Sequence, residues 1–331
     1  MLTLRNMDIS NAHDEAFARF LEFHDAFSMQ FKAAVTALAY CSRDASSDEF
    51  LTQMEKRWRD GHNWRKASAI LRQAGDDTCR MAIVRIHSAL DDFVVNVEAE
   101  RTRWRDLNAA TSRVKRNQKS VKAEDGDGNG DNKLTKMCHR TGLSAAEVKR
   151  CEPVLAYFRA IRNCIAHKSA RASRELQAAS TSGLLTKLMK TWPKRKGAKP
   201  PPIAPYECGQ PILVQPKAVI LYLDATRRCC GDIDKSLLEY LGCAGLSYCA
   251  AHHLLLDESL ETLPTSYRRP NRGINHVLTT RYNVNAPGNQ PMEELQRLGL
   301  WEKCRRRHAK LYKQSIDAGL FKLPHGFRCP T

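Results

Sequence analysis

Apolar side chains recur every three or four positions over long stretches of the chain, which is the spacing of one face of an α-helix. The first stretch covers about residues 11–41 and brings Phe17, Phe20, Phe27 and Phe31 onto one face. A second stretch, about 77–107, carries a similar stripe, made of Ile83, Ile86, Leu90, Phe93, Val97 and Trp104. Both stretches are predicted to be long amphipathic helices.

Shorter helical patterns fill most of the remaining chain, and no segment shows the alternation of a half-buried strand. Ser144 and Glu147 have the spacing of a capping box, and Pro153 suits the first turn of a fresh helix. Further helices are predicted at about residues 50–58, 64–73, 153–167 and 217–241 and at both ends of 246–331. The sequence therefore predicts an all-α fold, with an antiparallel helical bundle over 1–245 and a small helical accessory region over 246–331.

Two polar segments interrupt the bundle. Residues 113–136 are basic and then acidic, and they predict a flexible loop. Asp125 opens a run in this loop that fits the start of an EF-hand, but Lys136 stands where calcium needs a bidentate glutamate. Residues 190–216 are basic and rich in proline, which predicts an extended, exposed linker.

Charge is the first indication of a partner. The chain has 53 Lys and Arg against 36 Asp and Glu, so its net charge of +17 favours binding to polyanions such as RNA. Aromatic residues make up only 7%, which disfavours an aromatic platform for stacking bases. Basic residues gather at 113–122, in the linker and at 301–313, where they can contribute affinity.

The 12 cysteines do not indicate a disulfide framework or a metal site. The first residues lack the apolar segment of a signal peptide, and no apolar run is long enough to cross a membrane. We therefore expect a cytoplasmic protein with free thiols and no membrane association. Cys243, Cys249, His252 and His253 are the best cluster of possible ligands, but their spacing matches no common zinc pattern. No metal ion and no cofactor are predicted.

An arginine followed by a histidine after four to six residues occurs five times, close to what chance predicts in so basic a chain. The pairs are Arg19/His24, Arg57/His62, Arg80/His87, Arg162/His167 and Arg269/His276. Their surroundings differ: His24 lies on the apolar stripe of the first helix, and Arg80/His87 lies in mid-helix. Only Arg162 is followed by a polar residue suited to organise a site, Asn163.

Helix geometry connects these residues. Asn163 and His167 are four positions apart and share a helix face, so the amide is expected to orient the imidazole. Arg162 projects from the neighbouring face, and its long guanidinium can reach a phosphate that His167 also contacts. These three residues are the predicted catalytic set.

The run RNCIAH, from Arg162 to His167, resembles the Arg-x(4–6)-His motif of HEPN domains (higher eukaryotes and prokaryotes nucleotide-binding), where a polar residue often follows the arginine. The stretch from Ile86 to Val95 is similar to an earlier HEPN helix that carries an acidic residue, for which Asp91 and Asp92 are both candidates. Residues 217–241 are similar to the helix that closes the bundle. The resemblance covers about residues 10–245 and implies a HEPN-like bundle.

The resemblance also implies a function. HEPN ribonucleases cut RNA without a metal ion by using its 2′-hydroxyl, and they commonly act as toxins or antiphage defence effectors. Such enzymes work as homodimers in which the motifs of two subunits meet at one cleft, and an antitoxin or another regulatory protein often controls them. The resemblance therefore implies a homodimer and a possible antitoxin or regulatory partner for this chain. A non-catalytic HEPN module that binds RNA or nucleotides, and an unrelated helical protein, are the alternatives, because fold analogy does not establish activity.

Overall fold

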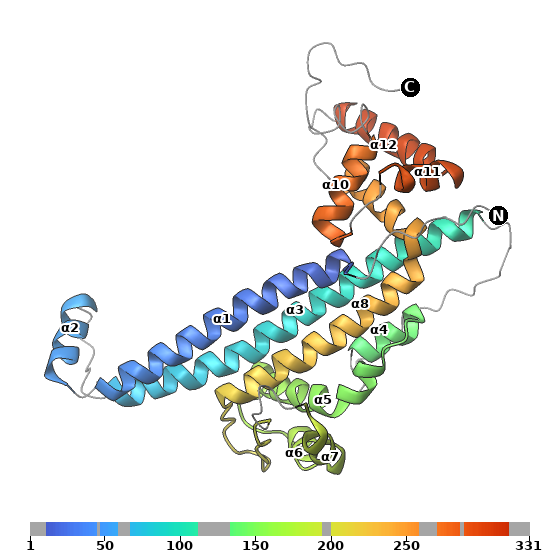
Figure 1. The fold of residues 1–331 in the computed structure, drawn as a ribbon. Coiled ribbons are helices and arrows are strands. Elements are labelled where there is room, and N and C mark those ends of the chain that lie inside the picture. Colours follow the sequence, from blue (N-terminus) through green and yellow to red (C-terminus); the bar gives the residue numbers. More distant parts are fainter. Residues whose placement is uncertain are drawn as a thin grey trace.

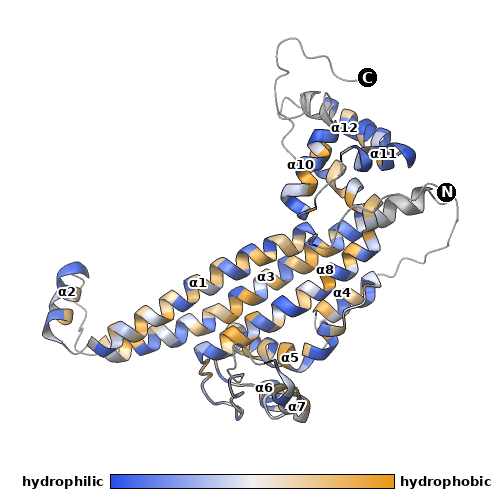
Figure 2. Cartoon of the chain, viewed as in Figure 1, coloured by the Kyte–Doolittle hydropathy of each residue, from blue (hydrophilic) through white to orange (hydrophobic). Residues whose placement is uncertain are grey.

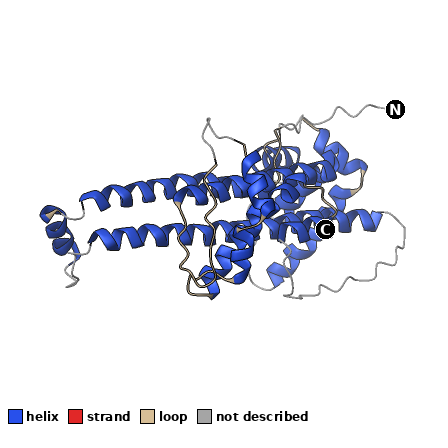
Figure 3. Ribbon diagram, turned by 90° about the horizontal axis from the view of Figure 1, so that it is seen from below, coloured by secondary structure: helices blue, strands red, loops and turns tan. Residues whose placement is uncertain are grey.

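The computed structural model describes residues 11–44, 47–58, 67–111, 133–193, 200–257, 270–284 and 288–317. Every element of regular secondary structure in these ranges is helical (Figure 1, Figure 3). The all-α class predicted from the sequence is confirmed.

Four long helices form the centre of the molecule: α1 (Glu15–Asp44), α3 (Ala67–Thr111), α5 (Ala146–His167) and α8 (Pro216–His252). Each runs opposite to the one before it along the chain (Figure 1). α3 contacts the other three, and α8 also contacts α1 and α5. The result is an antiparallel bundle in which α3 is the shared neighbour.

The core lies where the apolar stripes of these helices meet. The ring of Phe93 on α3 lies 5.8 Å from that of Phe20 on α1, and Phe158 of α5 stacks at 4.6 Å on Tyr222 of α8. All four side chains are buried, and burying one such side chain contributes about 1.5–3 kcal/mol. Polar and apolar positions are interspersed along each long helix, as an amphipathic helix requires (Figure 2).

One end of α1 and of α3 extends beyond the other bundle helices as a two-helix arm, with α2 (Asp48–Trp58) past its tip (Figure 1, Figure 3). The apolar stripe of α1 continues into the arm, but Val35 and Leu38 are only half-buried there. Tyr40 is 68% exposed. Two paired helices bury a smaller fraction of each helix surface than a four-helix bundle does.

The segment predicted as an exposed linker is partly folded onto the bundle. Tyr206, Ile212 and Val214 are buried, and the Tyr206 hydroxyl donates to the Leu213 carbonyl oxygen at 2.7 Å. Residues 209–212 pair by backbone hydrogen bonds with residues 170–172, just after α5. The prediction from composition was wrong here, because the apolar residues of the segment find a surface between α5 and the short helices α6 (Arg174–Ser180) and α7 (Gly183–Thr191).

The predicted accessory region is continuous with the bundle. α8 passes through residue 245, where the domain boundary was expected, and continues past Gly242, whose φ of 57° marks a kink. A short π-helix, η2 (His253–Asp257), follows α8. Three further helices then pack against α8: α10 (Pro270–Tyr282), α11 (Gln290–Arg297) and α12 (Leu300–Asp317).

Two predicted helix starts differ from the structure. Residues 67–73 and 77–107 belong to one helix, α3, which continues through Gly75; a glycine in a helix costs only about 1 kcal/mol. Pro153 lies inside α5 and does not begin it. The expected capping box of Ser144 is not formed, because Asp232 of α8 accepts from the Glu147 backbone N–H at 2.8 Å and caps α5 from a distance.

The predicted flexible loop is shorter than expected, because α4 (Lys133–Thr141) begins inside it. Residues 112–132, with the EF-hand-like run, lie outside the described residues. Within the described ranges the cysteines are free thiols, and no helix has both the length and the apolar character that crossing a bilayer demands.

A pair of carboxyl groups is buried where α1 begins. Asp14 caps α1 by accepting from the Phe17 N–H at 2.5 Å. Asp234 of α8 in turn accepts from the Asp14 N–H at 2.7 Å and lies 3.2 Å from Nδ1 of His13. Burial raises the pKa of Asp234 to about 7, and burial together with the charge of Asp234 raises the pKa of Asp14 well above its usual range.

We expect Asp234→Asn to change how stability depends on pH. Because the pKa of Asp234 is higher in the folded state, the wild type loses stability as pH rises from about 4 through 7. Asparagine resembles the protonated acid, so the variant should melt moderately above wild type at pH 5 and several degrees further above it at pH 8, at about 2–4 °C per kcal/mol. Thermal melts at both values measure this.

The matched control is Glu239→Gln, which removes an exposed carboxylate from the same helix. It should change the melting temperature equally at the two pH values. An Asp234→Asn variant that is less stable than wild type at pH 8 would contradict the assignment of Asp234 as a buried acid with a raised pKa.

Candidate functional site

The residues Arg162, Asn163 and His167 lie on the last two turns of α5. The neighbouring residues Ile161 and Cys164 are buried and fix the helix against the core. Arg162 and Asn163 are half-buried, whereas His167 is exposed at the end of the helix. The three residues thus form a gradient from the interior to the surface.

Asn163 does not orient His167 as predicted. Its Oδ1 accepts a hydrogen bond from Nη1 of Arg162 at 3.2 Å, so the amide holds the arginine instead. The helix ends at His167, and Ser169 and Ala170 then take positive φ values of 50° and 56° as the chain turns away. The four-residue spacing placed Asn163 and His167 on one face, but the neighbouring guanidinium takes the amide oxygen.

Arg162 has an unused donor. Its Nε is buried and has no hydrogen-bond partner in the structure. A buried donor without a partner costs about 1–3 kcal/mol, and more for a charged group. An anion that reaches this side chain would therefore gain a hydrogen bond as well as charge attraction. Of the predicted set, Arg162 is the residue that keeps a buried side-chain donor without a partner.

His87 of α3 faces the same place, although the sequence placed it with Arg80. Its Nδ1 lies 3.0 Å from the Tyr222 hydroxyl, which is buried in the core. Arg80 instead pairs with Asp77 at 2.8 Å. The arginines that influence His87 electrostatically are Arg162 and Arg159, both on α5.

The charges around His87 define the local field. Burial lowers the pKa of His87, and the negative charge of Asp91 opposes this. Nearby positive charges lower it further: those of Arg162, Lys133 and Arg159. Lys133 of α4 also forms an ion pair with Asp91 at 2.7 Å. The cluster is therefore a cationic site with a neutral imidazole and one carboxylate.

The two acidic candidates are separated by the structure. Asp91 lies one turn from His87 and shares the field of Arg162. Asp92 is exposed and lies beside Arg19 and Phe20 of α1, on a different side of α3. Successive residues of a helix point about 100° apart, so the two could not both face α5. The spacing of His87 and Asp91 was the sequence signal that could have identified His87.

The other histidines in the predicted pairs lie elsewhere. His24 is buried at the edge of the core and lies 2.9 Å from Oδ1 of Asp25, as its place on the stripe predicted. His276 is exposed on α10. His62 lies outside the described residues.

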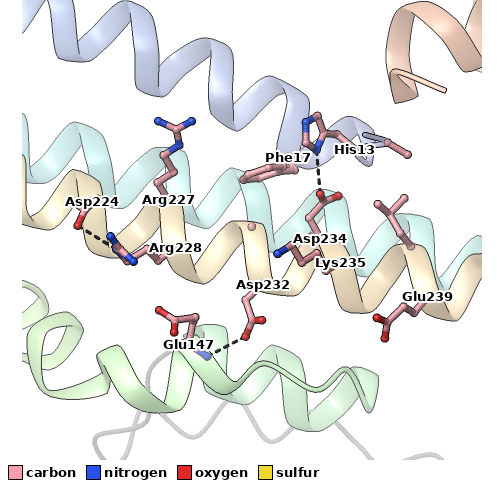
Figure 4. Close-up of a pocket in the computed structure, with 13 residues that line it drawn as sticks. His13, Phe17, Glu147, Asp224, Arg227, Arg228, Asp232, Asp234, Lys235 and Glu239 are labelled. Carbon is pink, nitrogen blue, oxygen red and sulfur yellow. Dashed lines mark hydrogen bonds and ion pairs between the residues drawn. The ribbon is translucent and has the colours of Figure 1, made fainter. Parts of the chain in front are cut away.

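A groove of about 900 Å³ lies elsewhere, between α1, α8 and the start of α5 (Figure 4). It shares no residue with the Arg162 cluster. Basic residues line it, among them Arg227, Arg228 and Lys235, but Glu147, Asp224, Asp232, Asp234 and Glu239 line it too. Arg228 is paired with Asp224 at 3.0 Å (Figure 4). This mixture of charges does not favour an RNA backbone.

We expect the pKa of His87 to change when a neighbouring charge is removed. Arg162→Gln removes a positive charge and should raise that pKa, whereas Asp91→Asn removes the opposing negative charge and should lower it. Titration of the imidazole resonances by NMR measures both shifts. The exposed His276 is the internal control and should not move. Shifts of equal sign in the two variants would contradict the arrangement.

No protein-family model, curated protein or solved structure matches the chain.

Proposed function

We propose that this protein is an endoribonuclease that cleaves RNA through the RNA's own 2′-hydroxyl, with Arg162 binding the phosphate that is cut. The observation that carries the proposal is the buried, unpartnered Nε of Arg162 in a cationic cluster beside His87. A planar guanidinium can hold two phosphate oxygens at once and stabilise the charge that develops on them.

The reaction needs one proton acceptor and one proton donor. The 2′-oxygen forms a bond to phosphorus as a base takes its proton, and the bond from phosphorus to the 5′-oxygen breaks as an acid protonates the leaving group. The products are a 2′,3′-cyclic phosphate and a 5′-hydroxyl. The nucleophile belongs to the RNA, so the step requires no metal-bound water.

His87 and His167 can divide these roles. A histidine whose pKa is lowered is neutral at pH 7 and can accept a proton, which suits His87 to the role of base. His167 is exposed and can meet the leaving group from the solvent side. In a homodimer, the second copy would bring another His167 to the same cleft. Asp91 supports the site by moderating its positive field.

RNA affinity would come largely from outside the cluster. The net charge of +17 and the exposed arginines of α12, such as Arg306 and Arg307, attract phosphates without reading sequence. Such a nuclease would need control in the cell. The proposed role is therefore that of a toxin or antiphage effector whose activity an antitoxin or another regulatory partner inhibits.

The second candidate function is RNA or nucleotide binding without cleavage. Asn163 holds Arg162 and leaves His167 without an orienting contact from that amide, which favours a phosphate-binding site over a catalytic one. The two candidates predict different results with the same RNA.

Purified protein should cut single-stranded RNA in excess EDTA and leave 2′,3′-cyclic phosphate ends, because the 2′-hydroxyl is the nucleophile. Mass spectrometry of the fragments measures the ends. An EDTA treatment that abolishes cleavage while the protein stays folded by circular dichroism, with recovery on adding a divalent ion, would reject the mechanism. Retention of RNA without fragments would support the binding module.

Histidine variants test the division of roles. His167→Ala and His87→Gln should each slow cleavage by about 10²–10⁴-fold, the usual size of an acid–base contribution. Glutamine in place of His87 can keep a hydrogen bond to Tyr222, so the melting temperature of that variant should remain close to wild type. His276→Ala is the control and should retain full activity. Full activity of His87→Gln would remove His87 from the mechanism and leave the two His167 copies of a dimer.

A further inference from the structure

A second cluster of polar groups is buried in the C-terminal third of α3. Glu15 at the start of α1, Glu100 on α3 and His253 after α8 are 8%, 3% and 4% exposed. One donor atom from each, two carboxylate oxygens and an imidazole nitrogen, lie within 4.8 Å of one another. Three helices distant in sequence thus bring three possible metal ligands to one point.

Glu100 is the member of this cluster whose burial no contact among the described residues compensates. Its Oε2 is buried and accepts no hydrogen bond in the structure. Oδ2 of the neighbouring Asp14, whose side chain is fully buried, also has no partner. Burial raises the pKa of Glu100, and the charge of Asp14 raises it further. Such a carboxyl group must either carry a proton or face a cation.

Glu15 is held so that one oxygen faces the cluster. Its Oε1 accepts from Arg281 at 2.8 Å and also from Arg19, while its Oε2 lies 2.7 Å from Nε2 of His253. Burial alone would raise the pKa of Glu15, but the hydrogen bond and charge of His253, with those of the two arginines, lower it to about 2. Glu15 is therefore ionised, and its outer contacts orient it as those of metal-binding carboxylates do.

We propose that Glu15, Glu100 and His253 bind one divalent transition-metal ion, of the class of Zn²⁺ or Mn²⁺. The ion would replace the proton that His253 shares with Glu15, and it would supply the partner that the buried Oε2 of Glu100 lacks. A mixed set of nitrogen and oxygen ligands suits these ions better than Mg²⁺ or Ca²⁺, which prefer oxygen alone. The ion would connect the start of α1, α3 and the end of α8.

This site is separate from the proposed RNA site. Glu100 follows His87 by thirteen residues on α3, so at about 1.5 Å per residue they lie roughly 20 Å apart along the axis. The ion is thus assigned to holding the fold together and not to the cleavage step. Its presence does not depend on whether the protein cuts RNA.

The first experiment measures metal in the full-length wild-type protein, purified without a polyhistidine tag or chelator. Elemental analysis should find about one equivalent of Zn or Mn per chain. X-ray absorption at the metal edge should show nitrogen and oxygen ligands at about 2.0–2.2 Å and no sulfur at about 2.3 Å, although Cys249 is close by. Less than a tenth of an equivalent, in protein that also gains no thermal stability from added Zn²⁺ or Mn²⁺, would overturn the proposal. A sulfur shell would also overturn the assigned ligand set.

The second experiment uses Glu100→Gln, with Glu22→Gln on the exposed side of α1 as the matched control. The Glu100→Gln protein should contain at least tenfold less bound metal per chain than wild type. Its melting temperature should no longer respond to Zn²⁺ or EDTA. The control should behave as wild type. If Glu100 is simply a protonated acid, glutamine replaces it without loss, and wild type and variant respond alike, which would overturn the proposal. RNA cleavage is measured in parallel, and its absence with metal bound would count against the nuclease alone.

Discussion

The structure depends on the uninterrupted course of α3. This helix of 45 residues contacts α1, α5 and α8, so it sets the distance between the two polar clusters described above. His87 and Asp91 lie near its middle, and Glu100 lies three to four turns later. Both clusters lie on the C-terminal side of Gly75, so a break at that glycine would leave the distance between them unchanged.

Both clusters consist of buried or half-buried charged groups, but the sign of the excess charge differs between them. Around Arg162 the positive charges outnumber the negative ones, and the histidine among them stays neutral. Around Glu100 carboxyl groups dominate, and Arg281 and Arg19 both pair with Glu15. An excess of positive charge needs an anion from outside, whereas an excess of carboxylates needs protons or a cation. The two clusters along α3 therefore favour ligands of opposite sign.

The sequence was sufficient for what depends on local order. The periodic stripes predicted the helical class and the buried faces, including Phe20, Phe27 and Phe93, because each helix buries one side. It was insufficient where partners come from distant helices. The cap on α5 comes from Asp232, and Arg162 finds His87 across the bundle, so spacing along the chain could reveal neither. Glu15, Glu100 and His253 share no motif at all.

These misses have one cause in common. Buried polar side chains break the local pattern of apolar and polar positions, and folded proteins tolerate such breaks where a partner or a function compensates for them. Glu100 stands three positions after Val97, on the buried apolar face of α3. Asp14 caps α1 from inside the core. In the sequence such residues are exceptions to the pattern. In the folded chain they gather at the helix junctions, where ligand binding could lower the free energy that their burial costs.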